Sequence, residues 1–291
     1  MRIILWDYME NAEEVMTKGA LATMSNTVAP DLRVTEEQKH KMIRYSKKMK
    51  LSSILDFGYY IFSFEGVSRS FTHQWVRYRI AAHMQQSLRY VKINTERANW
   101  FVIPPSIIKK GYDSVVEYIK NQLAAGKTYL GLLERGIPAE DARFALPIGV
   151  RTHISSAFDS EEMIHIIYQR TCFDAQWEIR TAAYAVLLAG LIVHPLIFDG
   201  VGPACIMEGI CRGRSKWKCK KDVERILEGL KKIAEEYRPK FNDLQRGMYL
   251  RIDLTDILGY RAPDTLKRKI YEDLGYQVGL DYEVILEVKK K

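Results

Sequence analysis

The chain has 291 residues and a net charge of +8, from 44 Lys and Arg against 36 Asp and Glu. Hydrophobic residues make up 47% of it, which is enough to bury a core and excludes a wholly disordered chain. The positive charge favours anionic partners such as nucleotides, polyanionic cofactors or nucleic acid.

The first half of the chain predicts alternating strands and short or medium helices. The first fifteen residues lack the design of a signal peptide, because acidic residues follow a very short apolar run. The pattern of bulky and polar residues predicts strands at 2–8, 59–68, 87–93 and 100–104. Helical periodicity predicts helices at 11–25, 35–50, 68–79 and 108–135.

The second half predicts longer helices. After a strand at 150–158 we expect one long helix at 160–193, capped by Ser160 and with two glutamates in its first turn. Further helices are predicted at 220–237 and 262–276, with a short strand before the second and a final strand at 281–288. The class is α+β, with strands scattered among long helices. The longest apolar stretch, 184–198, is too short to span a bilayer, so we expect a soluble, cytoplasmic protein without a membrane partner.

Residues 77–90, RYRIAAHMQQSLRY, combine three arginines with glutamines and a serine. Helical spacing puts Gln74 and Arg77 on one face, and strand spacing does the same for Ser87 and Arg89. With Arg79 and Gln85 these side chains can line one pocket, in which arginine binds phosphate and glutamine or serine binds a uracil-like edge. A solvated basic surface is the alternative.

Arg170 lies at the centre of an apolar stripe that includes Met163 and Ile167. An arginine in such a place needs a partner, since an unpaired buried charge is costly. Asp174, one turn on, is one candidate partner, and a bound phosphate is the other. Arg143, just before FALP, is a further candidate for the same anion.

Three blocks of the sequence, in order, resemble the flavin-dependent thymidylate synthases, the ThyX family. Residues 77–90 resemble its signature R-H-R-x-x-S-x-N-x-x-S-x-R-Y, ARFALP (142–147) resembles A-R-x-x-L-P, and residues 165–180 resemble H-F-x-x-x-R…A-Q-W-E-I-R. The resemblance implies a ThyX-like fold, with long helices around a twisted, mainly antiparallel sheet. We expect a catalytic domain at 1–220 and a C-terminal helical and strand extension at 221–291.

The resemblance also implies an activity and an assembly. Members transfer a methylene group from methylenetetrahydrofolate to dUMP, with hydride from FAD that NADPH reduces, and so form dTMP. They are homotetramers whose active sites are shared between chains. The main alternative is a related protein that binds a uridine nucleotide but has lost or changed the flavin chemistry.

The matched positions imply a set of site residues. Substrate binding falls to Gln74, Arg77, Gln85, Ser87, Arg89, Arg143 and Arg170. Catalysis falls to Ser87, as a positioning donor, and to Arg170. FAD binding falls to Ser25, Ser53, Arg77, Arg79, Ile80 and His165. A flavin mechanism needs no protein nucleophile, because the cofactor carries the difficult step.

Five positions depart from the family pattern, mostly on the flavin side. Tyr78 stands for the signature His, Ala82 for its first Ser and Met84 for its Asn. Leu51 stands where relatives have a His that contacts the flavin, and Asp159 replaces an Asn beside it.

The cysteines and the basic run at 211–221 leave further alternatives open. Cys205, Cys211 and Cys219 with His194 resemble a zinc ligand set, but their spacing matches no common finger, and a disulfide competes with it. We therefore place no metal among the site residues. Cys172 is expected to be an inert thiol in the middle of a helix. The basic run around Trp217 suits nucleic acid, although a solvated hairpin is favoured and we expect no such partner.

Overall fold

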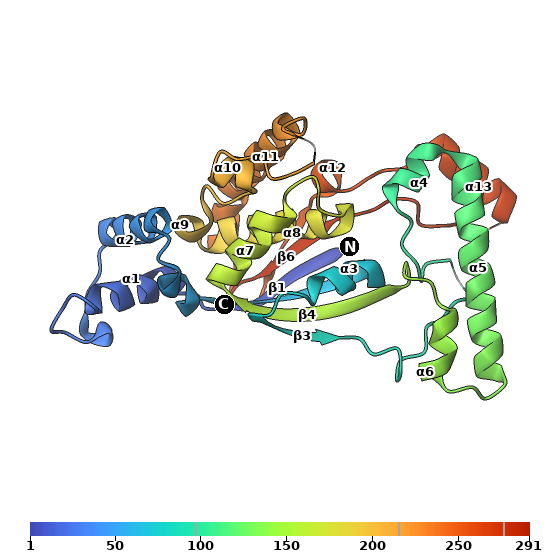
Figure 1. Ribbon diagram of the computed structural model, residues 1–291, viewed down its shortest axis with the longest axis horizontal. Helices are drawn as coiled ribbons and strands as arrows, with labels where there is room; N and C mark the ends of the chain where they lie inside the picture. The colour runs from blue at the N-terminus through green and yellow to red at the C-terminus, as the bar shows by residue number, and fades with distance from the viewer. Residues whose placement is uncertain (97, 215, 276) are drawn as a thin grey trace.

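The computed structural model describes residues 1–96, 98–214, 216–275 and 277–291 (Figure 1). It is a mixed α+β structure in which an open six-stranded sheet carries helices on one face and at both ends. Helices α1 and α2 extend beyond one end of the sheet, and the long helix α5 stands across the other end (Figure 1). None of the described helices is long and apolar enough to cross a membrane.

The sheet has the strand order β3-β4-β2-β1-β6-β5. Its members are β1 (Arg2–Tyr8), β2 (Tyr59–Ser68), β3 (Ala81–Gln85), β4 (Arg151–Asp159), β5 (Tyr249–Asp253) and β6 (Ile285–Lys289). Only the β1–β6 pair is parallel, which confirms the expected mainly antiparallel sheet. β2 forms because alternate bulky side chains, Tyr60, Phe62 and Phe64, all point into the core, where each is fully buried.

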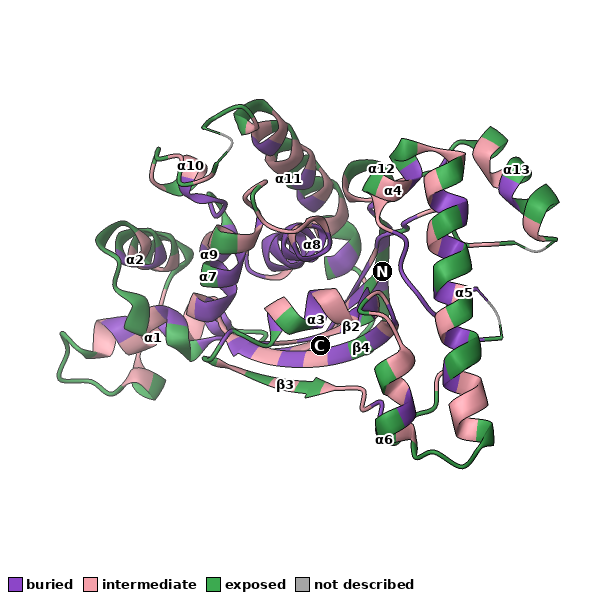
Figure 2. Cartoon of the chain, turned by 45° about the vertical axis from the view of Figure 1, so that its right-hand side comes forward, coloured by how far each residue is buried: buried purple, intermediate pink, exposed green. Residues whose placement is uncertain are grey.

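The helices divide between the sheet face and the two ends. The longer ones are α1 (Ala12–Ala22), α2 (Glu36–Met49), α5 (Tyr112–Glu134), α7 (Ser160–Arg170), α8 (Trp177–Val193), α11 (Lys220–Asn242) and α13 (Asp264–Leu274). The short ones are α3 (Arg69–Trp75), α4 (Pro105–Lys110), α6 (Ala139–Ala142), α9 (Pro195–Phe198), α10 (Ala204–Met207) and α12 (Thr255–Leu258). Helix α8 is buried nearly all round and packs between the sheet and α11 (Figure 2). A helix that is apolar on every side needs such a central place.

Three expected elements are wrong. The segment 87–93 is not a strand: the edge strand is β3, from Ala81 to Gln85, and it pairs with β4. Residues 100–104 form only a single bridge, between Phe101 and Val150. The expected helix at 160–193 is interrupted, because α7 ends at Arg170 and α8 begins at Trp177.

The ends of these two helices explain the interruption. Gln176 starts α8, since its side-chain oxygen accepts hydrogen bonds from the backbone N–H of Glu178 and Ile179. Ser160 does not cap α7. Asp159 does, by accepting from the backbone N–H of Glu162 at 2.7 Å. The single helix expected at 160–193 is therefore two helices, and the apolar stripe that includes Met163 and Ile167 lies on the first of them.

The C-terminal part of the chain joins the same sheet. β6 lies between β1 and β5, so the sheet runs across the boundary expected at residue 220. Helix α13 packs against α5 at the far end of the molecule (Figure 1). It covers Asp264–Leu274 of the expected helix 262–276, whose last residue lies outside the described residues.

Candidate functional site

Arg170, at the end of α7, is held by Tyr78 and not by Asp174. Its Nε donates a 2.6 Å hydrogen bond to the Tyr78 hydroxyl, and its guanidinium lies 5.4 Å from the centre of the Tyr78 ring. Asp174 instead accepts from the backbone N–H of Arg214 at 2.5 Å and lies 3.7 Å from its side chain. Among the described residues no carboxylate pairs with Arg170, so the half-buried guanidinium keeps its capacity for an anion.

Tyr78 links Arg170 to His165 through one more side chain. The Tyr78 hydroxyl donates to the Gln169 side-chain oxygen at 3.3 Å, and the Gln169 amide lies 2.9 Å from His165 Nε2. Burial raises the pKa of Tyr78, an effect that the charge of Arg170 partly offsets, so the phenol stays protonated and can donate. We call these four residues the Arg170 network.

The network joins a position expected to bind the substrate phosphate to one expected to bind FAD. Sequence reasoning treated Tyr78 only as a departure from the signature and missed Gln169 altogether. The helical spacing of His165 and Gln169, four residues apart, is the signal that could have found it.

A cavity of about 480 Å³ lies between the end of α2, the 3₁₀ helix η2 (Ser52–Phe57) and α7. It is lined by both His165 and Leu51, two positions that the family resemblance places at the flavin. Leu55 and Ile164 add an apolar surface, and three lysines, Lys47, Lys48 and Lys50, line its edge. An apolar wall beside basic side chains suits a flavin ring and a diphosphate, so the residues present fit FAD.

The three lysines are not equivalent. Lys47 Nζ donates to the backbone carbonyls of Leu196 and Asp199, and burial lowers its pKa. It is therefore already engaged in holding α2 against the turn after α9. Lys50 is itself exposed and lies 3.7 Å from the partly buried Glu208, which leaves Lys48 and Lys50 as the cations that a diphosphate could reach.

The other residues expected at the flavin lie on exposed segments. Ser25 follows α1, where its hydroxyl accepts from the backbone N–H of Thr27, and Ser53 lies in η2. Arg77, Arg79 and Ile80 are exposed in the turn between α3 and β3, with Ile80 at 67% of its full accessibility.

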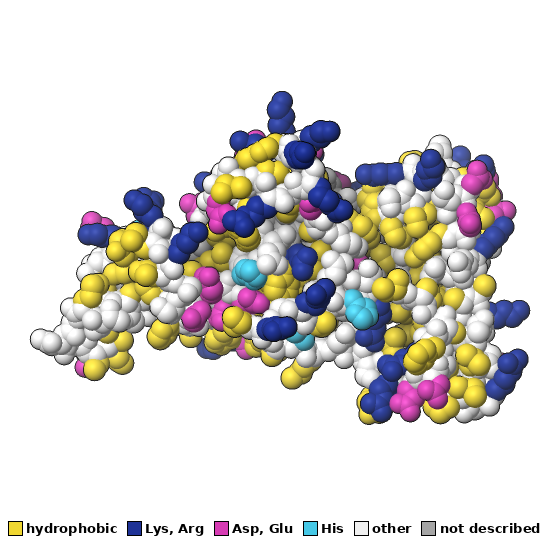
Figure 3. Space-filling model, viewed as in Figure 1, with side chains coloured by type: hydrophobic (Ala, Val, Ile, Leu, Met, Phe, Trp, Pro, Cys, Tyr) yellow, Lys and Arg dark blue, Asp and Glu magenta, His cyan; other side chains and the backbone are white. Residues whose placement is uncertain are grey.

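Arg89 and Arg143 meet at Glu140, on α6. Arg89 Nε donates to the Glu140 carboxylate at 2.9 Å, and Arg143 Nε donates to the Glu140 backbone carbonyl at 2.9 Å. We call these three residues the Glu140 group. Figure 3 shows basic and acidic side chains side by side at the lower right, over the place of α6 in Figure 1. Sequence reasoning missed Glu140, which lies 51 residues from Arg89 in the chain.

The remaining expected substrate residues are held by local bonds. Gln85, at the end of β3, donates to the Thr72 hydroxyl at 2.8 Å, which ties β3 to α3. Gln74 donates to the backbone carbonyl of Ser70 at 3.5 Å. Ser87 accepts from the backbone N–H of Arg89 at 3.3 Å, which shapes the turn after β3.

Three of the residues that depart from the family pattern lie on the edge strand β3 or at the start of α7. Ala82 and Met84 are exposed on the edge strand β3, where Met84 keeps 80% of its accessibility. Asp159 caps α7, and burial raises the pKa of its carboxyl while the backbone N–H bonds of the cap oppose that rise. An aspartate here therefore does the work of a helix cap.

All four cysteines line one further cavity, of about 430 Å³, beside Arg170 and Asp174. Cys172 is therefore not in the middle of a helix, as expected, but in the turn between α7 and α8. His194 lies elsewhere: its Nδ1 is 2.9 Å from the Tyr60 hydroxyl in the core. Within the described parts of the chain no three His, Cys, Asp or Glu side chains are placed to hold a metal ion.

Two solved structures share this fold. A UMP/dUMP methylase, PolB from Streptomyces cacaoi bound with 5-Br dUMP, matches with a TM-score of 0.62 and 18% identity, over 68% of this chain and 92% of that one. The flavin-dependent thymidylate synthase ThyX from Helicobacter pylori, complexed with FAD and dUMP, matches with a TM-score of 0.56 and 21% identity, over 69% of this chain and all of that one. The fold is thus that of the ThyX class of α+β proteins.

Sequence similarity narrows the class to a family. The family described as thymidylate synthase complementing protein matches residues 4–196. The flavin-dependent thymidylate synthase of Sulfolobus acidocaldarius is 35% identical over 209 residues, which are 71% of this chain and 79% of that protein. That of Pyrococcus horikoshii is 39% identical over 191 residues, 64% of this chain and 77% of that protein. The chain belongs to this family, the flavin-dependent thymidylate synthases, which confirms the resemblance seen in its motifs.

Proposed function

We propose that this protein is a cytoplasmic, FAD-dependent thymidylate synthase that converts dUMP to dTMP with methylenetetrahydrofolate and NADPH. The observation that carries the proposal is the Arg170 network. It joins an arginine without a carboxylate partner among the described residues to a histidine in the wall of an apolar, lysine-edged cavity. In this proposal Arg170 binds phosphate, His165 contacts the flavin, and the hydrogen bonds between them hold the two sites in a fixed relation.

Arg170, Arg89 and Arg143 bind the phosphate of dUMP in this proposal. Arginine is suited to that role because its planar donors match phosphate oxygens in pairs. Gln85 and Ser87 orient the uracil ring through hydrogen bonds, and Gln74 and Arg77 complete the nucleotide site. Ser87 positions the ring and does not attack it. Arg170, held in place by Tyr78, fixes the substrate against the cofactor.

FAD supplies the hydride that completes the methyl group, after reduction by NADPH. In the proposal His165 and Leu51 hold the flavin ring, Lys48 and Lys50 face its diphosphate, and Ser25, Ser53, Arg77, Arg79 and Ile80 bind the rest of the cofactor. The apolar walls of Leu55 and Ile164 exclude water from the ring.

The proposed assembly is a homotetramer whose active sites are shared between chains. The Glu140 group lies beyond one end of β4, by α6, whereas α7 lies over the other part of that strand in Figures 1 and 2. No bond between described residues joins this group to the Arg170 network. A second chain that brings its own Glu140 group to the network would complete the arginine set. In this assembly residues 1–220 form the catalytic domain and residues 221–291 an extension that closes the sheet.

Titration of the purified protein with FAD and with dUMP tests the proposal. We expect the flavin absorbance spectrum to shift on binding and dUMP to bind with micromolar or tighter affinity. Arg170→Ala should weaken dUMP and leave FAD bound. A protein that binds dUMP but shows no FAD binding at any concentration would contradict the proposal and favour a nucleotide-binding relative without flavin chemistry.

A further inference from the structure

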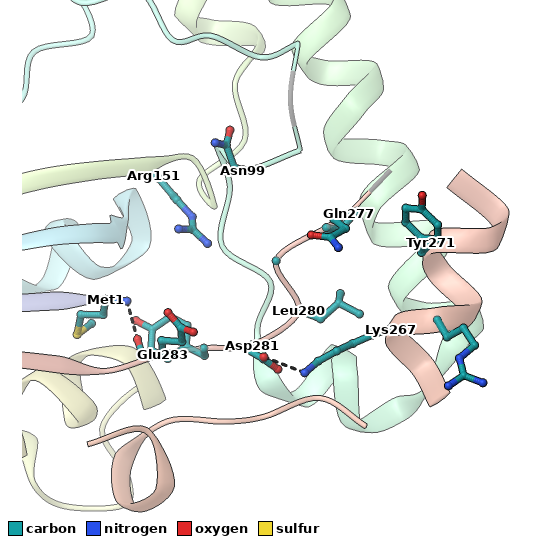
Figure 4. A pocket seen from close by; sticks show the side chains of 13 residues that line it. Met1, Asn99, Arg151, Lys267, Tyr271, Gln277, Leu280, Asp281 and Glu283 are labelled. Carbon is teal, nitrogen blue, oxygen red and sulfur yellow. Dashed lines mark hydrogen bonds and ion pairs between the residues drawn. The ribbon is translucent and has the colours of Figure 1, made fainter. Parts of the chain in front are cut away.

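A cavity of about 590 Å³ lies away from the proposed active site (Figure 4). One wall comes from the family-matched part of the chain and includes Asn99 and Arg151. The other wall comes from C-terminal residues beyond that match, namely Lys267, Arg268, Tyr271 and residues 277–283. Its volume is in the range of sites that enclose small metabolites.

Arg151 begins β4 and points its guanidinium into this cavity (Figure 4). Its Nε donates to the backbone carbonyl of Phe101 at 3.0 Å, which fixes the plane of the group. Among the described residues no carboxylate lies within ion-pair distance of it. Burial lowers the pKa of Arg151, and the nearby Tyr282 and Glu178 oppose that shift.

Of the acidic residues Asp281, Glu178 and Glu283 near the cavity, the first two are engaged or neutral, and Glu283 is an exposed carboxylate of the lining. Asp281 pairs with Lys267 at 2.9 Å and also accepts from the backbone N–H of Ala262. Glu178, behind the wall, accepts from Ser68, and burial raises its pKa so that its charge is disfavoured.

The charges that line the cavity leave a positive excess. Its lining has three basic side chains, Arg151, Lys267 and Arg268, and two carboxylates, Asp281 and Glu283. Since Asp281 pairs with Lys267, Arg151 and Arg268 together outweigh Glu283, and Arg151 is the arginine that points into the cavity (Figure 4). Gln277, on the opposite wall, adds a neutral amide that can donate a hydrogen bond (Figure 4).

We propose that this cavity binds the phosphate group of a small phosphorylated metabolite, with Arg151 as its principal ligand. A phosphate oxygen pair would take the two free Nη groups of Arg151, while Phe101 keeps the guanidinium in plane. The bound anion would join β4 to the C-terminal segment, and so stabilise the fold by mass action. The proposal does not depend on the thymidylate synthase activity, because none of these residues belongs to the proposed active site.

Isothermal titration with inorganic phosphate and with AMP tests the proposal. The titrations use the Arg170→Ala protein, so that the proposed substrate site contributes little, and sodium chloride at matched ionic strength as the control for screening. We expect one phosphate site, competition between AMP and phosphate for it, and a melting temperature that rises with either ligand. Adding Arg151→Ala should weaken both ligands at least about tenfold.

Two further variants control for other causes of weaker binding, namely unfolding of Arg151→Ala and a general loss of positive charge. Gln277→Glu leaves Arg151 and its bond to Phe101 in place but adds a carboxylate to the opposite wall, so it should weaken phosphate severalfold. Arg225→Ala removes an exposed arginine on α11 that pairs with Asp222, and it should leave phosphate binding unchanged. Phosphate affinity unaltered by both Arg151→Ala and Gln277→Glu, no binding at phosphate concentrations up to about 10 mM, or no competition by AMP would each overturn the proposal.

Discussion

Replacing Tyr78 by phenylalanine tests the Arg170 network most selectively. The change removes the hydroxyl that accepts from Arg170 Nε and donates to Gln169, and it leaves the aromatic ring. Tyr78 is only 6% exposed, so the ring should keep its packing against Trp75 and His165. The variant therefore separates the positioning of Arg170 from the packing of the core.

The magnitude follows from the bond that is lost. A hydrogen bond to a charged group contributes about 1.5–3 kcal/mol when it is well made and shielded from water. Arg170 is half-buried, so water can partly replace the hydroxyl, and we take the lower end. A loss of about 1.4 kcal/mol is a tenfold loss of dUMP affinity. The free energy of unfolding should fall by less than about 1.5 kcal/mol, because Gln169 is exposed and can bind water instead.

The assay is a dUMP titration paired with urea unfolding of the wild type, Tyr78→Phe and Tyr249→Phe. Tyr249 is an exposed tyrosine on β5 and serves as the matched control. We expect dUMP to weaken about tenfold in Tyr78→Phe alone. If dUMP affinity is unchanged while the unfolding free energy drops by several kcal/mol, Tyr78 is a core residue and the network does not position the substrate.

Three other predictions test separate parts of the account. Arg170→Ala should weaken dUMP binding by about 10- to 100-fold with little loss of melting temperature. Arg170→Lys should recover little of that affinity, since an ammonium lacks the planar fork of a guanidinium. Unchanged affinity with a large drop in melting temperature would make this arginine structural. Glu140→Gln should strengthen dUMP binding by about two- to fivefold, because the exposed carboxylate competes with phosphate for Arg89. This gain in affinity should shrink as salt is added. Weaker dUMP binding in the variant would show that Glu140 supports the site. His194 is buried, and burial lowers its pKa from 6.5 to about 4, so the unfolded chain takes up a proton there first. Stability should therefore fall by up to about 3 kcal/mol as pH drops from 6.5 to 4, measured by urea unfolding, and His194→Gln should flatten that slope; an equal slope in both proteins would refute the assignment.

The strands with clear alternation were predictable from sequence, and those without it were not. In β2 the alternate side chains Tyr60, Phe62 and Phe64 are bulky and buried, and in β4 every second side chain from Thr152 to Phe158 is buried, so the alternation indicates both strands. β3 contains small and polar residues and is a strand only because it pairs with β4 from Ala81 to Gln85. That pairing depends on tertiary contacts, which no local pattern shows. The alternation of residues 87–93 predicted the edge strand in the wrong place.

The site was predictable at the level of residue types but not of partners. Periodicity placed Arg170 on the buried side of α7, yet apolar residues on both sides of the turn hid the break at Gln176. Its bond to Tyr78 joins residues 92 apart in the chain, and the bond of Arg89 to Glu140 joins residues 51 apart. No local rule predicts such contacts, because they follow from how α3, α6 and α7 pack on the sheet.

Turnover with all components present tests the central claim most directly. The purified protein would be incubated with FAD, dUMP, methylenetetrahydrofolate and NADPH, and nucleotides would be identified by mass spectrometry. The account predicts dTMP that forms only when all four are present and that Arg170→Ala strongly reduces. Absence of dTMP from protein that demonstrably binds both FAD and dUMP would contradict it.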